Sequence, residues 1–317
     1  MTKKLEPPKY IIILGTTFSG SGAIFDYLVG RNDLDNPLKG EEYLLPILPN
    51  GFMDLEAAAG KAFDPATSEY HLMKFQEISE KLSNFWSNGP KKKELRKFAE
   101  IFHKNISQLI NEISSANYPM RILWRELFKT PLEKNLNRIK NLIGLEESIP
   151  PTRLLVSPKK LIEAVEKMHD NLFKIHSGKR STILNQAGSG WNPIDSTKYF
   201  NDRKTILVTR DPRDQYLEIK QYKKGQSIMG FIDWYKEMQN RLKLISDENI
   251  FQVRFEDFVN NNSKYTKVIC DYLKLSDRVS SSYRAELSKK NVRKFQKFKD
   301  QKEIRLIEDN LEEFIYD

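Results

Sequence analysis

The feature that most constrains the fold is an apolar run that leads into a loop of small residues near the start of the chain. Residues 10–14 read Tyr-Ile-Ile-Ile-Leu, which predicts a buried β-strand. Beyond the loop, Ile24, Tyr27 and Leu28 recur at helical spacing. A strand, a small-residue loop and a helix N-terminus together form a cradle for anions, because backbone amides converge there and the helix dipole favours negative charge.

The loop has the composition of a phosphate-binding loop. Residues 15–22 hold three glycines and four hydroxyl side chains, and hydroxyls add hydrogen bonds that amides alone do not provide. An ordinary strand-to-helix turn is the alternative. Ala23 stands after Ser21-Gly22 where a nucleoside triphosphatase loop needs its lysine, and Phe25 stands where a dinucleotide fingerprint needs its third glycine.

Composition bounds the class of protein. The 317 residues suffice for one large α/β domain or two smaller ones. A single cysteine, Cys270, excludes an internal disulfide, and with four scattered histidines it offers no metal-ligand cluster. The apolar runs are too short for a signal peptide or a membrane span, so we expect a soluble cytoplasmic protein. The net charge of +9 suits nucleic acid, an anionic nucleotide or an acidic polysaccharide.

Two adjacent carboxylates, Glu41 and Glu42, follow about 20 residues after the loop. In α/β folds the segment after the first helix returns to the sheet, so a side chain there can face the crevice at the strand ends. A solvated pair in a loop is the alternative.

The middle of the chain reads as successive helices with no strand signal. Examples are residues 75–85, 94–113 and 121–143. We therefore expect a large helical insertion at about residues 51–150, covering an acceptor site.

A second buried strand, residues 204–209, runs into Arg210-Asp211-Pro212-Arg213-Asp214. This order predicts two guanidinium groups at the crevice edge, where bidentate phosphate contacts form. A structural Arg–Asp cluster is the alternative. Further strands at residues 181–186 and 250–258 alternate with helices, which predicts an α/β fold with a central parallel sheet flanked by helices.

Together these pieces resemble the sulfotransferases that use 3′-phosphoadenosine 5′-phosphosulfate (PAPS). The resemblance covers about residues 9–50 and 180–317. Ser19-Gly20-Ser21-Gly22 is similar to the core of the family's 5′-phosphosulfate loop, and Arg210–Asp214 to its 3′-phosphate motif. The basic stretch Lys289–Lys297 is similar to the late loop that closes over the 3′-phosphate. The resemblance implies a P-loop-like fold, with residues 1–317 forming one sulfotransferase domain.

The same resemblance implies roles for individual residues. Glu42, followed by an aromatic residue as in many carbohydrate sulfotransferases, becomes the preferred catalytic base, with Glu41 second. No metal is implied. The residues implied to bind the donor are Thr16, Thr17, Phe18, Ser19, Gly20, Ser21, Gly22, Ala23, Arg210, Glu218, Lys289, Lys290, Asn291 and Arg293.

Three positions depart from the family pattern. Phe18 stands where a lysine or arginine often stabilises the leaving oxygen, so we expect either that another cation serves or that the reaction is slower. Glu218 replaces a serine, and we expect it to turn away because its charge repels a 3′-phosphate. Arg293 replaces a glycine of the late loop.

The activity implied is transfer of a sulfuryl group from PAPS to an acceptor hydroxyl, leaving 3′,5′-adenosine bisphosphate (PAP). A carbohydrate or glycolipid acceptor follows from family analogy alone. Two alternatives stay open at this point: a nucleotide kinase, despite the missing loop lysine, and a non-catalytic nucleic-acid-binding protein that uses the basic surplus.

Overall fold

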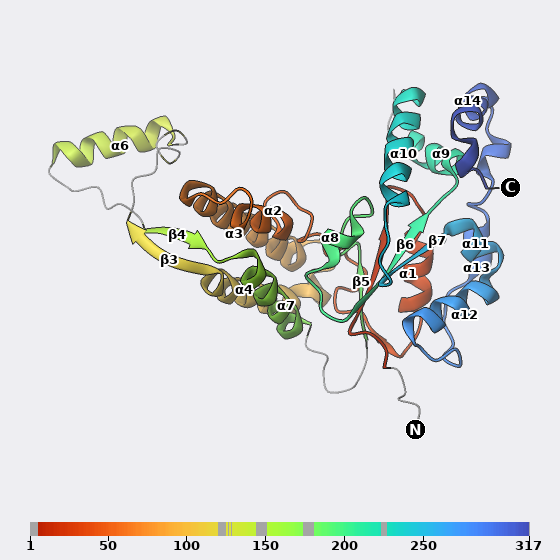
Figure 1. The fold of residues 1–317 in the computed structure, drawn as a ribbon, viewed down its shortest axis with the longest axis horizontal. Coiled ribbons are helices and arrows are strands. Elements are labelled where there is room, and N and C mark those ends of the chain that lie inside the picture. The colour runs from red at the N-terminus through yellow and green to blue at the C-terminus, as the bar shows by residue number, and fades with distance from the viewer. Residues whose placement is uncertain are drawn as a thin grey trace. The chain divides into compact units, whose positions relative to one another are not determined.

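The computed structural model describes residues 6–119, 125, 127, 129–143, 151–173, 181–222 and 227–316. The chain separates into two compact units (Figure 1). The sheet unit comprises residues 1–47 and 173–317, and the helical unit comprises residues 48–172. That both belong to one domain stays a prediction.

The sheet unit is built on five parallel strands in the order β2-β5-β1-β6-β7. This arrangement confirms the central parallel sheet flanked by helices. β1, the apolar run that precedes the small-residue loop, lies in the middle, and both of its neighbours come from the second half of the chain. The strands are β1 (Tyr10–Gly15), β2 (Leu34–Asp35), β5 (Ser181–Asn185), β6 (Arg203–Thr209) and β7 (Ile250–Arg254).

Both faces of β1 are buried, which explains its uninterrupted apolar sequence. On one face, Ile11 and Ile13 belong to a core formed with α1 (Ser21–Val29), α11 (Phe255–Asn260) and α12 (Asn262–Leu273). On the other face, the ring of Tyr10 packs edge-on against Phe200, with centroids 5.4 Å apart. The centre of the sheet is therefore a fixed base for the loop that follows β1.

The remaining elements of the sheet unit follow β5, β6 and β7 along the chain. They are α8 (Pro193–Thr197), α9 (Pro212–Tyr222), α10 (Ile228–Lys243), α13 (Ala285–Lys289), the 3₁₀ turn η1 (Lys294–Lys297), α14 (Gln301–Leu311) and η2 (Glu312–Phe314).

The helical unit confirms the helix-rich character predicted for the middle of the chain. Trp86 of α3 packs edge-on against Phe102 of α4, with ring centroids 4.9 Å apart, and both side chains are buried. The helices are α2 (Phe52–Ala59), α3 (Pro65–Asn88), α4 (Lys92–Glu112), α6 (Pro131–Leu142) and α7 (Pro158–Leu172).

The prediction that this middle region contains no strand is wrong. β3 (Ser114–Pro119) pairs antiparallel with β4 (Pro151–Leu155). The residues of β3 are mostly polar and carry no alternating pattern, so only pairing with a distant segment makes them extended. The helix predicted over residues 121–143 lies partly outside the described residues, and its described end is α6. No helix among the described residues is both long and apolar enough to cross a membrane.

Candidate functional site

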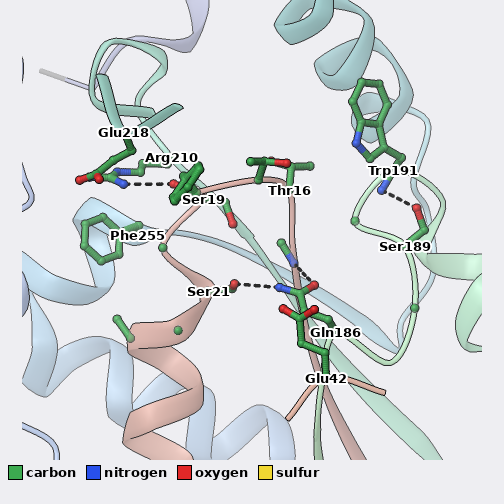
Figure 2. Close-up of a pocket in the computed structure, with 18 of the residues that line it drawn as sticks. Thr16, Ser19, Ser21, Glu42, Gln186, Ser189, Trp191, Arg210, Glu218 and Phe255 are labelled. Atoms are coloured by element: carbon green, nitrogen blue, oxygen red, sulfur yellow. Dashed lines mark hydrogen bonds and ion pairs between the residues drawn. The ribbon is translucent and has the colours of Figure 1, made fainter. Parts of the chain in front are cut away.

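A pocket of about 710 Å³ lies where β1, β5 and β6 end (Figure 2). Its lining comes from the sheet unit alone. Gly15 ends β1, Gln186 follows β5 and Arg210 follows β6, so the carboxyl ends of three neighbouring parallel strands contribute to the pocket. This is the edge at which open α/β sheets bind ligands.

The small-residue loop forms one wall of this pocket, and all of Thr16–Ala23 lines it. Phe18 and Gly20 have positive φ angles of 57° and 83°, which turn the chain sharply into α1. A side chain at Gly20 would collide with the ring of Phe255. Glycine is therefore required here by both conformation and space.

The loop and the start of α1 leave polar groups available to a ligand. Gly20 is the N-cap of α1 and provides no side-chain cap, so the first helical amides are open to an anion. The Ser19 hydroxyl is buried and has no hydrogen-bond partner within the described structure. Buried polar groups without a partner are uncommon, and together these groups suit a phosphate or a sulfate.

Two glutamines, which sequence reasoning missed, hold the loop in place. Gln186 donates to the Ser21 hydroxyl over 3.1 Å and accepts from the Gly15 amide over 3.2 Å. Gln215, fully buried, donates to the Thr16 hydroxyl over 3.1 Å and to the Thr17 carbonyl over 2.5 Å. The only sequence signal for either residue is its place just after a strand or in the first turn of a helix that follows one.

Arg210 forms the cationic part of the pocket and is nearly buried. Its guanidinium donates to the Phe18 carbonyl over 3.0 Å and to the Asn291 carbonyl over 2.7 Å. It also lies over the ring of Phe255, 5.0 Å from the centroid. Its Nε atom is buried without a partner within the described structure. Arg210 therefore connects the small-residue loop to the late loop, and its Nε–H group has no hydrogen-bond acceptor among the described residues.

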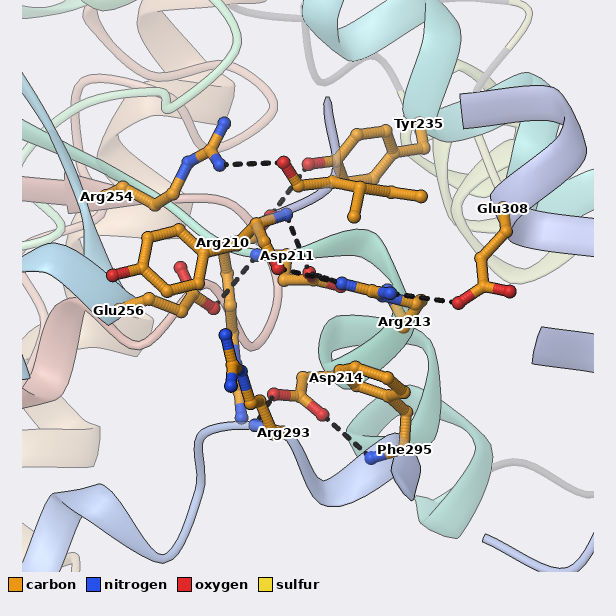
Figure 3. A network of polar contacts seen from close by, with 12 residues as sticks. Arg210, Asp211, Arg213, Asp214, Tyr235, Arg254, Glu256, Arg293, Phe295 and Glu308 are labelled. Carbon is orange, nitrogen blue, oxygen red and sulfur yellow. Dashed lines mark hydrogen bonds and ion pairs between the residues drawn. The ribbon is translucent and has the colours of Figure 1, made fainter. Parts of the chain in front are cut away.

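The second arginine of the motif, Arg213, does not line the pocket, so the prediction of two guanidinium groups at the crevice edge is wrong for it. Arg213 donates to Asp211 over 2.7 Å, to Glu308 over 2.9 Å and to the Tyr316 carbonyl over 2.9 Å (Figure 3). Three acceptors in a buried network satisfy this guanidinium. For Arg213 the alternative, a structural Arg–Asp cluster, is the observed state.

The late loop contributes less to the pocket than expected. Asn291 lines the pocket, whereas Lys289, Lys290 and Arg293 are exposed and lie outside its lining. Arg293 adopts a positive φ of 59°. Glycine, the residue that Arg293 replaces relative to the family pattern described above, adopts this conformation without strain. Asp214 fixes this turn by accepting hydrogen bonds from the amides of Arg293 over 2.6 Å and Phe295 over 3.0 Å (Figure 3).

The expectation that Glu218 turns away is wrong. Its carboxylate lines the pocket, lies 3.7 Å from the Arg210 guanidinium and accepts from Lys294 over 2.6 Å. Two cations attract it toward the site, which outweighs any preference for solvent. The pocket therefore already holds one negative charge beside Arg210.

Glu42 lines the same pocket, while its neighbour Glu41 does not. Backbone pairing places it, since the Tyr43 amide donates to the Asn185 carbonyl over 3.0 Å. Partial burial raises the pKa of Glu42 above its ordinary value, and the charge of Glu41 raises it further. A carboxylate with a raised pKa is a stronger proton acceptor once it is ionised.

Glu256 lies behind the motif, fully buried, and accepts from the Asp211 amide over 3.0 Å (Figure 3). Burial raises its pKa to about 7. A carboxyl whose pKa is higher in the folded than in the unfolded chain favours folding when protonated. This contribution is lost as the pH rises from about 4.5 to about 7, at a cost of about 3 kcal/mol.

Replacement of Glu256 by glutamine is therefore expected to raise the free energy of unfolding by only about 1 kcal/mol at pH 5 and by about 3 kcal/mol at pH 8. Glutamine keeps the acceptor for the Asp211 amide but carries no charge. Urea unfolding at both pH values measures the difference, with the exposed Glu237→Gln as the control. An equal difference at pH 5 and pH 8 would show that the charge of Glu256 does not matter.

The fold and the pocket define a parallel α/β protein whose central strand is followed by a loop with the geometry of an anion site. No protein-family model matches the sequence, and no curated protein matches it either. Among the described residues, no three His, Cys, Asp or Glu side chains gather as a metal site requires.

The chain is similar to three solved structures, all sulfotransferase domains, which is the family that the sequence resembles. The domain from the Synechococcus PCC 7002 olefin synthase is 14% identical, with 100% of this chain and 98% of that chain covered and a TM-score of 0.46. The domain from the curacin biosynthetic pathway is 12% identical, with 86% and 76% covered and a TM-score of 0.38. Sulfotransferase STF9 from Mycobacterium avium is 11% identical, with 98% and 78% covered and a TM-score of 0.37. Since these scores are low, the function is inferred from the site.

Proposed function

We propose that this protein transfers a sulfuryl group from PAPS to a hydroxyl group of an acceptor. The observation that carries the proposal is the shared pocket of an open anion-binding loop, a nearly buried arginine and a carboxylate with a raised pKa. These are the three functions that such a transfer needs: a cradle for the donor, an anchor for its second phosphate and a base for the acceptor.

The donor is held by the loop and by Arg210. The uncapped amides at the start of α1, with the hydroxyls of Ser19 and Ser21, bind the 5′-phosphosulfate. The guanidinium of Arg210 binds the 3′-phosphate, for which its fork of donors is suited. PAPS supplies the sulfuryl group that is transferred.

Glu42 acts as the general base. As the acceptor oxygen forms its bond to sulfur, the proton of the hydroxyl passes to the Glu42 carboxylate. The bond between sulfur and the bridging oxygen breaks at the same time, and PAP leaves with its electron pair. The raised pKa of Glu42 makes its carboxylate a better proton acceptor than an ordinary glutamate.

The leaving oxygen is stabilised by backbone amides and the dipole of α1. Among the described residues that line the pocket, Arg210 is the one basic side chain, and the proposal assigns it to the 3′-phosphate. Preorganised amides in a sheltered site stabilise developing charge without a side-chain cation. The loop therefore takes over the role that a lysine at position 18 would have.

The acceptor is a carbohydrate or glycolipid hydroxyl, by analogy with the family that the sequence resembles. The pocket lining also includes the apolar side chains Leu44, Ile47 and Trp191, and the Trp191 ring packs edge-on against Trp234, with centroids 5.4 Å apart. Apolar and aromatic lining of this kind is suited to contact the carbon face of a sugar ring.

The activity is tested by incubating the protein with ³⁵S-labelled PAPS and a panel of simple sugars, and by following label transfer and PAP release. We expect release of PAP that depends on an acceptor and does not require magnesium. ATP turnover with magnesium, in the absence of any PAP release, would contradict the proposal and favour a kinase.

Glu218 is expected to weaken 3′-phosphate binding, because its carboxylate lies beside the same guanidinium. Glu218→Ser removes this charge and should raise the affinity for PAP about tenfold, with little change for 5′-AMP, which has no 3′-phosphate. Calorimetric titration of both nucleotides measures the effect. Glu303→Ser, which removes a carboxylate outside the pocket, is the control. Unchanged or weaker PAP binding in Glu218→Ser would show that the carboxylate does not oppose the phosphate.

A further inference from the structure

α6 is a helix of the helical unit (Figure 1), and its N-terminus is capped by its own residues. Pro131 occupies its first turn, the Thr130 amide donates to Glu133 over 2.7 Å, and the Glu133 amide donates to the Thr130 hydroxyl over 3.3 Å. These reciprocal bonds form a capping box. A helix of 12 residues is nevertheless marginal in water unless one of its faces is covered.

One face of α6 is apolar and uncovered. Leu132, Leu136, Ile139 and Ile143 recur at intervals of four, three and four residues, which places them on one stripe. With Leu142 beside them, these side chains are between 48% and 85% exposed. Scattered exposed apolar residues are ordinary, but a continuous stripe of this kind marks an interaction surface.

Basic side chains predominate among the charged residues of the helix. Lys134, Arg138 and Lys140 are exposed on the other sides of α6. The single acidic residue, Glu133, is engaged by Thr130, which lowers its pKa. A short helix with an apolar face and a lysine- and arginine-rich polar face is suited to lie in the interface of a membrane that contains anionic lipids.

A second copy of α6 fits this surface less well. The apolar stripe covers less than two heptads, whereas a coiled coil needs three or four. Two such helices would also bring their basic side chains together, since α6 carries only one acidic residue. An anionic bilayer offers both an apolar layer for the stripe and negative charge for the cations.

We propose that α6 attaches this protein to the surface of membranes that contain anionic lipids, with its axis in the plane of the interface and its apolar stripe inserted. Such attachment is independent of the sulfotransferase chemistry. It would bring the enzyme to acceptors carried on lipid.

Co-sedimentation of the full chain with vesicles tests the proposal. We expect binding to phosphatidylcholine vesicles that contain about one third phosphatidylserine, at least tenfold weaker binding to pure phosphatidylcholine, and weaker binding as salt is raised. The double variant Leu136→Glu/Ile139→Glu should lose at least tenfold in affinity, with unchanged circular dichroism in solution and unchanged PAP binding.

Met229→Glu/Leu244→Glu is the matched control, because it places the same two charges on exposed apolar side chains of the sheet unit, which are 47% and 82% exposed. It should bind vesicles as the unmodified protein does. The proposal is overturned if the unmodified protein does not bind, if it binds both lipid mixtures equally, or if the α6 variant binds normally. A dimer in the absence of lipid that the α6 variant dissociates would also overturn it and assign the stripe to a second copy.

Discussion

Replacement of Arg210 by alanine is expected to remove the preference for PAP over 5′-AMP. Hydrogen bonds to a charged partner contribute about 1.5–3 kcal/mol each, so the loss of two from a phosphate weakens PAP binding roughly 10²–10⁴-fold. Binding of 5′-AMP should change far less, because in the proposed arrangement its phosphate is held by the amides of α1. Calorimetric titration of both nucleotides gives the ratio.

The ratio matters because Arg210 also bonds to the Phe18 and Asn291 carbonyls, so its loss disturbs the loops themselves. A disturbed loop would weaken the binding of PAP and of 5′-AMP alike, whereas the loss of a contact to the 3′-phosphate would weaken the binding of PAP alone. Arg210→Lys keeps the positive charge but not the paired donors of the guanidinium. Its PAP affinity should therefore lie between those of Arg210→Ala and the unmodified protein. Arg305→Ala, on the exposed side of α14, should behave as the unmodified protein. An unchanged PAP preference in Arg210→Ala would place the 3′-phosphate elsewhere.

Glu42→Gln is expected to reduce turnover by about 10²–10⁴-fold and to leave PAP affinity nearly unchanged. Glutamine has almost the same shape but cannot take the proton of the acceptor hydroxyl. Single-turnover transfer from labelled PAPS measures the rate. Glu41→Gln is the matched control, since Glu41 lies outside the pocket lining, and it should keep most of the activity.

The pH dependence gives a second readout of Glu42. Because burial and Glu41 raise its pKa, the carboxylate is lost at a higher pH than in an ordinary glutamate. Turnover should therefore fall as the pH decreases through this raised pKa, and Glu41→Gln should shift that fall to lower pH. Full activity of Glu42→Gln at any pH would remove Glu42 from the role of base.

The parts of the fold that the sequence predicts well are those with strong local signals. β1 is a continuous apolar run because both faces of its sheet are covered, so the apolar residues 10–14 are enough to predict a buried strand. The loop after it is recognisable because glycine and hydroxyl residues are needed at a helix N-terminus that binds anions. β3 has no such pattern and depends on its partner strand.

Within the site, the residues that sequence reasoning missed or misplaced act through distant contacts. Gln186 and Gln215 are ordinary amides until the fold brings them to the loop, 171 and 199 residues away in sequence from the partners named above. Arg210 and Arg213 look equivalent in the motif, yet β6 ends so that only Arg210 lines the pocket. Glu218 is drawn in by Lys294, a partner that its local sequence does not reveal.

The central claim is that the pocket binds a nucleotide with phosphates at both the 5′ and the 3′ positions. Its most direct test is calorimetric titration of the unmodified protein with PAP, beside 5′-AMP and ATP. We expect PAP to bind with a micromolar dissociation constant and clearly more tightly than 5′-AMP. Equal binding of PAP and 5′-AMP, or tighter binding of ATP than of PAP, would contradict the account.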